Sequence, residues 1–147
     1  MAKKKNAKRR GAHEIREHIQ SGYAPQAVVI VVVPSHTKKK DRTSDQSTVA
    51  GKGMKLLARL FGGATQFNAQ RGVYKSKGSQ RLLWDNPILL ESYADREILN
   101  DIKRLGPLID FVKQMGRDLE QEAVALVIDG TMHVFEDFSG APEVRLI

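Results

Sequence analysis

A set of polar side chains could form a small-ligand or catalytic site if the fold brings them together. A general base needs a carboxylate or an imidazole, and an anion site needs cations, amides or hydroxyl groups. The candidate catalytic residues are Glu91, Tyr93, His36 and Glu122, and the candidate ligand- or anion-binding residues are Gly62, Gly63, Thr65, Arg117 and Gln121. Their spacing shows no nucleophile–base pair. Helix capping and surface ion pairs are the alternative explanation for the same residues.

Two of these candidates are consecutive glycines that follow a predicted helix. Gly62 and Gly63 can bring bare backbone N–H groups close to a bound anion, with Thr65 beside them. A glycine after a helix more commonly serves as a left-handed cap. Arg117 and Gln121 are four residues apart and can therefore share one helix face.

The sequence predicts neither a metal site nor a cofactor. The chain has no cysteine, which excludes disulfides, thiolate metal sites and a cysteine nucleophile. His13 and His18 are five residues apart, whereas a helical zinc pair needs histidines four apart. Gly51-Lys52-Gly53 lacks the spacing of a phosphate-binding P-loop. These glycines fit a helix that begins late or approaches a neighbouring element closely.

Positive charge is concentrated on two short segments. Six of the 24 lysines and arginines lie in residues 1–11, which leaves 18 in the rest of the chain against 17 acidic residues. A flexible basic segment gains affinity for phosphates by counterion release and reads no base sequence. The residues predicted to contact nucleic acid are Lys3, Lys4, Lys5, Lys8, Arg9, Arg10, Lys38, Lys39, Lys40 and Arg42. A solubilising tail, or contact with an acidic lipid or protein surface, explains the arm equally well.

The first half of the chain predicts a buried strand, a helix and two further strands. Residues 27–33 are a continuous apolar, mostly β-branched run, which is typical of a central strand buried on both faces. A polar loop follows, and apolar residues at helical spacing predict a helix over 48–61. Strands are expected at 64–75 and 81–93, joined by a polar turn.

The second half predicts two helical segments and a hairpin. Helical periodicity begins at Asp95 and is expected to break at Gly106-Pro107, where Pro107 opens a second helix that runs to Leu119. Apolar runs at 123–128 and 131–136 flank Asp129-Gly130. This dipeptide is a strong hairpin signal.

The element order predicts an α+β fold of ferredoxin-like βαββαβ layout, with an extra C-terminal hairpin strand and a disordered basic arm. Residues 1–22 are assigned to the arm, which includes a short helical stretch, 23–137 to one domain and 138–147 to a tail. An open α+β sheet with another strand order is the rival arrangement.

Three short motifs carry a resemblance to a known group of proteins. They are Leu60-Phe61-Gly62-Gly63-Ala64-Thr65, Gly72-Val73-Tyr74, and Gly116-Arg117 with Gln121-Glu122-Ala123-Val124. The chain resembles small bacterial α/β proteins without an assigned activity, over about residues 27–136. The resemblance implies a compact ferredoxin-like domain and no particular reaction.

These observations lead to three functional hypotheses. The first is a small accessory protein that binds DNA or RNA backbone non-specifically through its basic arm. The second is a small enzyme or ligand-binding domain with a polar site on its folded body, and the third is a homodimer or another protein-interaction module. The apolar run at 27–33 is too short to span a membrane. We therefore expect a cytoplasmic protein without a membrane partner.

Overall fold

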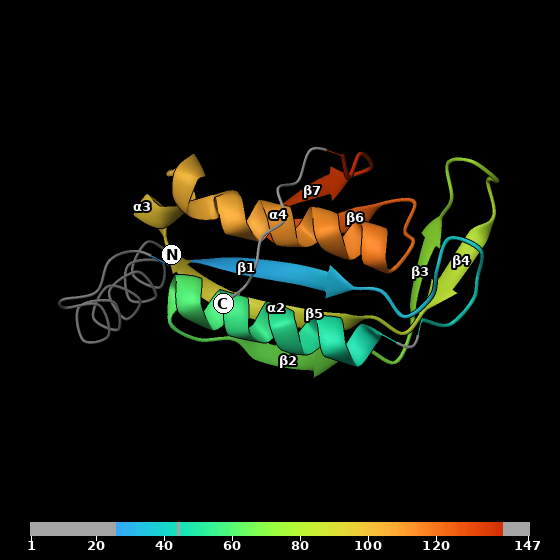
Figure 1. Cartoon of the computed structure of the whole chain (residues 1–147), viewed down its shortest axis with the longest axis horizontal. Coiled ribbons are helices and arrows are strands. Elements are labelled where there is room, and N and C mark those ends of the chain that lie inside the picture. The colour runs from blue at the N-terminus through green and yellow to red at the C-terminus, as the bar shows by residue number, and fades with distance from the viewer. Residues whose placement is uncertain (1–25, 44, 140–147) are drawn as a thin grey trace, which may run out of the picture.

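The computed structural model describes residues 26–43 and 45–139 (Figure 1). The basic arm and the short helix predicted before residue 23 lie outside the described residues. The described part forms a mixed α+β fold, with helices and strands in the order β1 (Gln26–Val33), α2 (Gln46–Phe61), β2 (Thr65–Asn68), β3 (Gly72–Lys75), β4 (Leu82–Asp85), β5 (Ile88–Asp95), α3 (Arg96–Leu99), α4 (Ile102–Asp118), β6 (Val124–Ile128) and β7 (Thr131–Phe135).

The main sheet is antiparallel and has the strand order β2-β5-β1-β6-β7. β1 lies at its centre and pairs along its whole length with β5, from Gln26 opposite Asp95 to Val33 opposite Ile88. On its other side, β1 pairs with β6 around Ile30 and Val127. The central position predicted for the apolar run 27–33 is confirmed.

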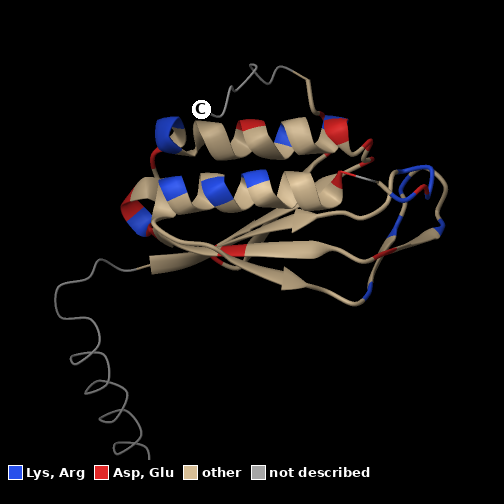
Figure 2. Ribbon diagram, turned by 60° about the horizontal axis from the view of Figure 1, so that its bottom comes forward, with Lys and Arg blue, Asp and Glu red and all other residues tan. Residues whose placement is uncertain are grey.

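Helices α2 and α4 cover one face of this sheet (Figure 2). Along β1 the odd-numbered residues from Ala27 to Val33 are buried beneath the helices, because successive side chains in a strand point to opposite faces. Leu57 of α2 and Leu108 of α4 are fully buried against them. The hydrophobic core therefore lies between the sheet and the two helices.

Helix α2 approaches the sheet closely at a glycine. A Cβ atom on Gly53 would lie 2.5 Å from Leu90 Cδ1 and 3.0 Å from Phe111 Cζ, whereas Gly51 has nothing within 4 Å. The helix ends at Gly62, which has φ +95° and donates its backbone N–H to Ala58 O at 2.8 Å. The close-approach interpretation of Gly53 and the capping interpretation of Gly62 are both confirmed.

The two long strands predicted at 64–75 and 81–93 are each divided. β2 and β5 belong to the main sheet, whereas β3 and β4 form a separate two-stranded hairpin. The division occurs near Pro87, whose carbonyl accepts the Ala69 N–H at 2.9 Å and whose ring contacts Gly72. Proline donates no ladder hydrogen bond, so the pairing cannot continue through it. The prediction of one strand over 64–75 was wrong, and Pro87 interrupts the second strand, as a proline within a strand predicts.

The helix break predicted at Gly106-Pro107 is also absent. Helix α4 runs unbroken from Ile102 to Asp118 with Pro107 inside it, and the Asp101 side chain caps its start by accepting the Lys103 N–H at 3.0 Å. A proline removes one intrahelical hydrogen bond. Burial of Leu105 and Leu108 on either side of Pro107 offsets that loss.

The C-terminal hairpin β6–β7 turns at Asp129-Gly130, as predicted. Both residues have positive φ, 50° and 79°, which is the backbone conformation of a type I′ turn. Asp129 also donates its backbone N–H to Val28 O at 2.9 Å and forms an ion pair with Arg96. The turn is thereby fastened to the start of the central strand.

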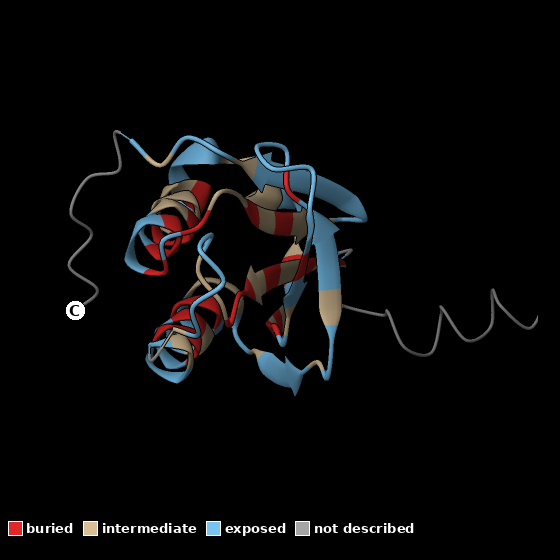
Figure 3. Cartoon of the chain, turned by 90° about the vertical axis from the view of Figure 1, so that its right-hand side faces the viewer, coloured by how far each residue is buried: buried red, intermediate tan, exposed pale blue. Residues whose placement is uncertain are grey.

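The second face of the sheet carries no helix among the described residues and is largely apolar. Register places Phe67, Leu89 and Val32 in one row across β2, β5 and β1, and it pairs Ala125 with Val134 on the same face in β6 and β7. Figure 3 shows how exposure increases toward the outer strands of this face. Phe67 is 49% exposed and Val134 is 55% exposed. We call this surface the open sheet face.

Candidate functional site

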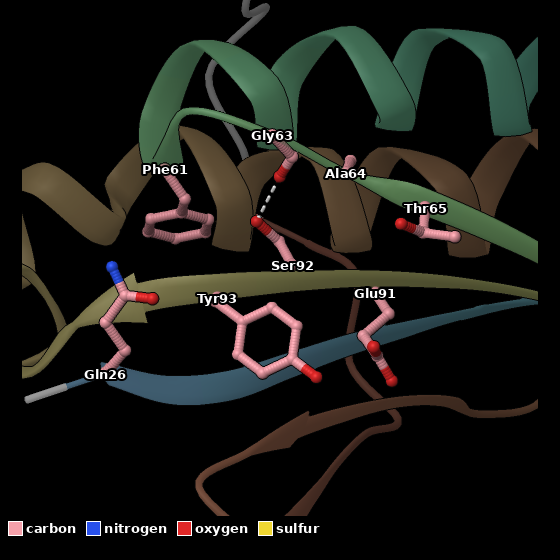
Figure 4. A pocket seen from close by; sticks show the side chains of 8 residues that line it. All are labelled: Gln26, Phe61, Gly63, Ala64, Thr65, Glu91, Ser92 and Tyr93. Carbon is pink, nitrogen blue, oxygen red and sulfur yellow. Dashed lines mark hydrogen bonds between the residues drawn. The ribbon is translucent and has the colours of Figure 1, made fainter. Parts of the chain in front are cut away.

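A hollow of about 400 Å³ lies where the chain leaves α2 and enters β2 (Figure 4). Three of the polar residues singled out in the sequence line it together: Thr65, Glu91 and Tyr93. The complete lining is Gln26, Phe61, Gly63, Ala64, Thr65, Glu91, Ser92 and Tyr93. The volume falls within the range of small-molecule pockets, although the hollow is open to solvent.

Strand register explains why these three side chains lie together. Thr65 is paired directly with Glu91 across β2 and β5, so both point to the open sheet face. Tyr93 follows Glu91 by two residues on β5 and therefore points to the same side. Figure 4 shows Tyr93 and Glu91 side by side on that side of β5. The hollow thus depends on a cross-strand pair, which the sequence spacing alone cannot reveal.

Gly63 closes the hollow from the helix side. Because β2 begins only at Thr65, the last residues of β5 have no partner strand on that edge. Gly63 lies in the connecting segment, and its carbonyl accepts the Ser92 hydroxyl at 2.5 Å. Gly62 caps α2 and does not line the hollow. The segment is held in place by its own hydrogen bonds.

Glu91 is the principal charge of the hollow. Its side chain is half-buried between Thr65 and Ile30. It makes no hydrogen bond or ion pair with any residue in 26–43 or 45–139. A carboxylate and the phenol of Tyr93 can together receive a cation and hydrogen-bond donors. Gln26, at 3.4 Å from Asp95 Oδ1, adds an amide at the rim.

Arg117 lies outside this hollow, on the last turn of α4. It donates hydrogen bonds to Phe138 O and, at 2.7 Å, to Gln114 Oε1. The ring of Phe138 lies against Gly116, where a Cβ atom would collide with it. Gly116 and Arg117 therefore hold residues after β7 against the helix, and packing extends at least to Phe138. The structure does not bring Arg117 to an anion site with Thr65.

Gln121 and His36 meet each other instead, at the opposite end of β1. The Gln121 side-chain amide donates to His36 O at 2.6 Å and to Leu119 O at 2.7 Å. Gln121 is buried. Gln121 fastens the loop after β1 to the end of α4 and does not line the hollow around Glu91.

Glu122 holds the tip of the β3–β4 hairpin. It accepts the Ser76 hydroxyl at 2.7 Å and the Gly78 N–H at 3.2 Å. These hydrogen bonds lower the pKa of the Glu122 carboxyl, the Ser76 bond contributing most. Of the candidate catalytic residues, Glu91 and Tyr93 therefore lie together, whereas His36 and Glu122 lie elsewhere.

One cluster of chemically capable residues was missed from the sequence. The Ser35 hydroxyl lies 2.6 Å from His36 Nδ1, donates to Asp85, and accepts the Asn86 N–H at 2.9 Å. Ser35 N–H also donates to Asp85 Oδ1 at 2.7 Å. Ser35 is fully buried, and its oxygen is occupied by these contacts, so it is not placed to attack a substrate. The cluster ties the loop after β1 to β4.

The predicted nucleic-acid-binding residues divide between described and undescribed parts. Lys3, Lys4, Lys5, Lys8, Arg9 and Arg10 lie outside the described residues. The side chains of Lys38, Lys39, Lys40 and Arg42 are all exposed, on a short loop closed by a bridge between His36 and Arg42.

The described residues contain neither a group of metal ligands nor a membrane-spanning helix. No three histidine or acidic side chains in 26–43 and 45–139 are grouped as metal ligands would be. None of the helices in that same part of the chain has the length and apolar character needed to cross a bilayer.

No protein family and no curated protein matches this chain. Two solved structures share its fold. A phage SAM lyase in complex with S-methyl-5′-thioadenosine aligns with a TM-score of 0.60 at 19% identity, over 83% of this chain and 98% of the lyase. The phage SAM lyase in its apo state aligns with a TM-score of 0.52 at 21% identity, over 80% and 94%. At this identity the likeness shows a common α+β fold with an antiparallel sheet.

Proposed function

We propose that this chain binds a small adenosine-containing sulfonium or thioether, the class of S-adenosylmethionine and S-methyl-5′-thioadenosine, in the hollow around Glu91. The observation that carries the proposal is the convergence of Thr65, Glu91 and Tyr93 on one hollow of about 400 Å³. The fold shared with a phage SAM lyase, solved with S-methyl-5′-thioadenosine, supports this choice of ligand.

The chemistry of the hollow suits a cationic ligand that also carries hydroxyl groups. A sulfonium centre would be attracted by the Glu91 carboxylate and by the ring face of Tyr93. Ribose hydroxyls have Thr65 and Gln26 as hydrogen-bond partners at the rim. If the protein is a lyase, the substrate's own carboxylate oxygen forms a bond to the carbon attached to sulfur as the carbon–sulfur bond breaks; the electron pair of that bond moves to sulfur and the carbon fragment leaves as a lactone. The sulfonium then becomes the neutral thioether.

Calorimetric titration of the full chain with S-adenosylmethionine and with S-methyl-5′-thioadenosine tests binding. Mass spectrometry of the same mixtures over time tests for thioether formation. Replacing Glu91→Gln removes the charge but keeps the shape, so we expect about tenfold or greater loss for the sulfonium and a smaller loss for the thioether. Glu97→Gln, on an exposed position of α3, is the matched control.

Two outcomes would contradict this proposal. The first is the absence of binding of either compound at millimolar concentration. The second is binding that Glu91→Gln and Tyr93→Phe leave unchanged, which would place the ligand elsewhere. Binding without turnover would restrict the function to a ligand-binding protein.

We also infer that the described fold is ferredoxin-like. With β3 and β4 treated as an insertion, β1-α2-β2-β5-α4-β6 has the order of a split βαββαβ unit, and β7 extends its sheet. An experimentally determined structure with another strand order would exclude this classification.

Nucleic-acid binding through the basic arm is a second candidate function. The observation favouring it is the segregation of charge onto residues 1–11. We expect affinity for mixed-sequence DNA and RNA that falls steeply with salt. Replacing the six arm lysines and arginines by glutamine should abolish it. Equal binding by that variant would remove the arm from consideration.

A homodimer through the open sheet face is a further proposal. Phe67, Tyr93, Met132 and Val134 are 49–62% exposed there. Half-exposed side chains of this size present roughly 400 Å² in total. A stable interface uses about 800 Å² per partner, so the half-buried neighbours such as Leu89 and Val127 would supply the remainder. Light scattering that shows a monomer at high concentration would exclude a second copy.

A further inference from the structure

A basic and aromatic surface lies at the end of the molecule opposite to the Glu91 hollow. The loop after β1 and the β3–β4 hairpin lie side by side there, because one small hollow is lined by both. Its lining consists of His36, Thr37, Lys40, Tyr74, Leu83, Trp84 and Asp85. Figure 2 shows Lys and Arg on the loops at this end of the molecule, in addition to those along the helices.

The loop is held in position by hydrogen bonds to two other segments. Ser35 binds Asp85 of β4 through its hydroxyl and its N–H, and Lys38 N–H donates to Glu120 O at 2.9 Å. Gln121 donates to His36 O from the end of α4 at 2.6 Å. The lysines are therefore carried on a loop whose backbone is held in place at both Ser35 and Lys38.

The hairpin contributes an outward apolar face. Val73 is paired with Trp84, and Lys75 with Leu82, so all four side chains lie on one side of the two strands. Val73, Leu82 and Trp84 are 49%, 59% and 54% exposed. The guanidinium of Arg71 lies 4.4 Å from the centre of the Trp84 ring. Arg71 therefore covers one face of the ring, and Trp84 as a residue remains 54% exposed.

Most cations of this surface are available to a ligand. Seven of them form no ion pair with a described residue: Lys38, Lys39, Lys40, Arg42, Arg71, Lys75 and Arg81. Lys77 differs, because it lies 2.5 Å from Glu136 Oε1, and this hydrogen bond raises its pKa. Arg71 and Lys75 share the Trp84 side of the hairpin, whereas the loop after β1 is held against the opposite side, at Asp85. This end of the molecule thus carries cations on both sides of the hairpin and one exposed aromatic ring.

We propose that this end of the fold binds single-stranded nucleic acid, with Trp84 stacking on a base and the cations contacting the backbone. Proteins that bind single strands combine a positive surface with aromatic stacking platforms. A duplex keeps its bases stacked on each other, so it can use the cations but not the indole. The inference rests on the second candidate function, nucleic-acid binding, and adds a site on the folded domain to the arm.

Trp84 is the chain's single tryptophan, so its fluorescence reports on this site alone. The test titrates the full chain with oligo-dT and with a duplex of equal charge, at low and moderate salt. We expect saturable quenching of Trp84 fluorescence by the oligo-dT and much weaker quenching by the duplex.

Variants then separate stacking from charge. Trp84→Ala should weaken oligo-dT binding about 5- to 150-fold, corresponding to about 1–3 kcal/mol for one stacked base, and Trp84→Phe should restore part of it. Phe67→Ala removes a similarly exposed ring from β2, an edge strand of the main sheet outside the hairpin, and is the matched control. Replacing Lys38, Lys39 and Lys40 by glutamine should lower the salt slope by about 2.

The following outcomes would contradict the inference. Unchanged fluorescence on binding, or equal affinity of Trp84→Ala and wild type, would confine binding to the arm. Loss of binding only in the glutamine-substituted arm would support the second candidate function and reject this site. Equal quenching by poly-glutamate would assign the surface to an acidic protein partner instead.

Discussion

The two glycines of α2 give a stringent test of how this helix packs. Gly51 and Gly53 are two residues apart in one helix, so each lowers the stability of the helix by the same intrinsic amount relative to alanine. Only Gly53 faces the core, where an added Cβ would lie 2.5 Å from Leu90 and 3.0 Å from Phe111. Gly51 is exposed with nothing within 4 Å. We therefore compare Gly53→Ala with Gly51→Ala.

The expected change in the free energy of unfolding combines two opposing contributions. Replacing a helical glycine by alanine stabilises a helix by about 0.8–1.0 kcal/mol. Overpacking a core costs about 1–3 kcal/mol. Leu90 is fully buried and Phe111 is nearly so, which limits how far either can move. Gly51→Ala should raise the free energy of unfolding by about 1 kcal/mol, whereas Gly53→Ala should lie about 1–3 kcal/mol below it.

Urea unfolding followed by circular dichroism measures both variants against wild type. The expected difference between them corresponds to roughly 3–12 °C in melting temperature for a domain of this size. Equal stabilisation by both substitutions would refute the close approach of α2 to β5 and α4. It would also reopen the question of why the sequence places Gly-Lys-Gly near the start of this helix.

Three further predictions concern the loops that brace the two proposed sites. Glu122→Gln should destabilise the protein at pH 7, because hydrogen bonds hold the Glu122 pKa below its ordinary 4.5. This stabilisation is present above pH 4.5 and is lost as the pH falls through the lowered pKa, so the difference in melting temperature between variant and wild type should shrink as the pH falls below 4.5. Ser35→Ala should cost about 1–3 kcal/mol in urea unfolding, since it removes the buried hydroxyl that donates to Asp85 and accepts the Asn86 N–H, and only the backbone N–H of residue 35 still holds Asp85. Gly130→Ala should cost about 1–2 kcal/mol by thermal melting, because its φ of +79° suits only glycine.

Local signals in the sequence predicted the elements that depend on local chemistry. The apolar run 27–33 became the central strand, and Asp129-Gly130 became a hairpin turn with both φ values positive. Pro107 misled the prediction, because burial on both sides of it outweighs one lost hydrogen bond. The strands expected at 64–75 and 81–93 are each divided, because their outer parts, β2 and β5, pair in the main sheet while β3 and β4 pair with each other in a separate hairpin.

The polar site was predictable only in part. Thr65, Glu91 and Tyr93 came together because β2 pairs with β5 next to the hairpin insertion. Arg117 and Glu122 were instead satisfied by local partners, Phe138 and Ser76. The Ser35–Asp85 contact joins residues 50 positions apart, and its only sequence signal was a polar pair directly after a buried strand.

The two proposed sites lie at opposite ends of β1, and this separation makes them independently testable. Gln26, the first residue of β1, lines the Glu91 hollow, whereas His36, three residues beyond its end, borders Trp84. Eight strand residues span about 25 Å, and substitutions farther apart than about 10 Å usually act additively. We therefore expect Glu91→Gln to leave oligo-dT quenching unchanged and Trp84→Ala to leave calorimetric binding of the sulfonium unchanged. A double variant whose effects are not additive would show that the strand couples the sites, or that both ligands occupy one surface.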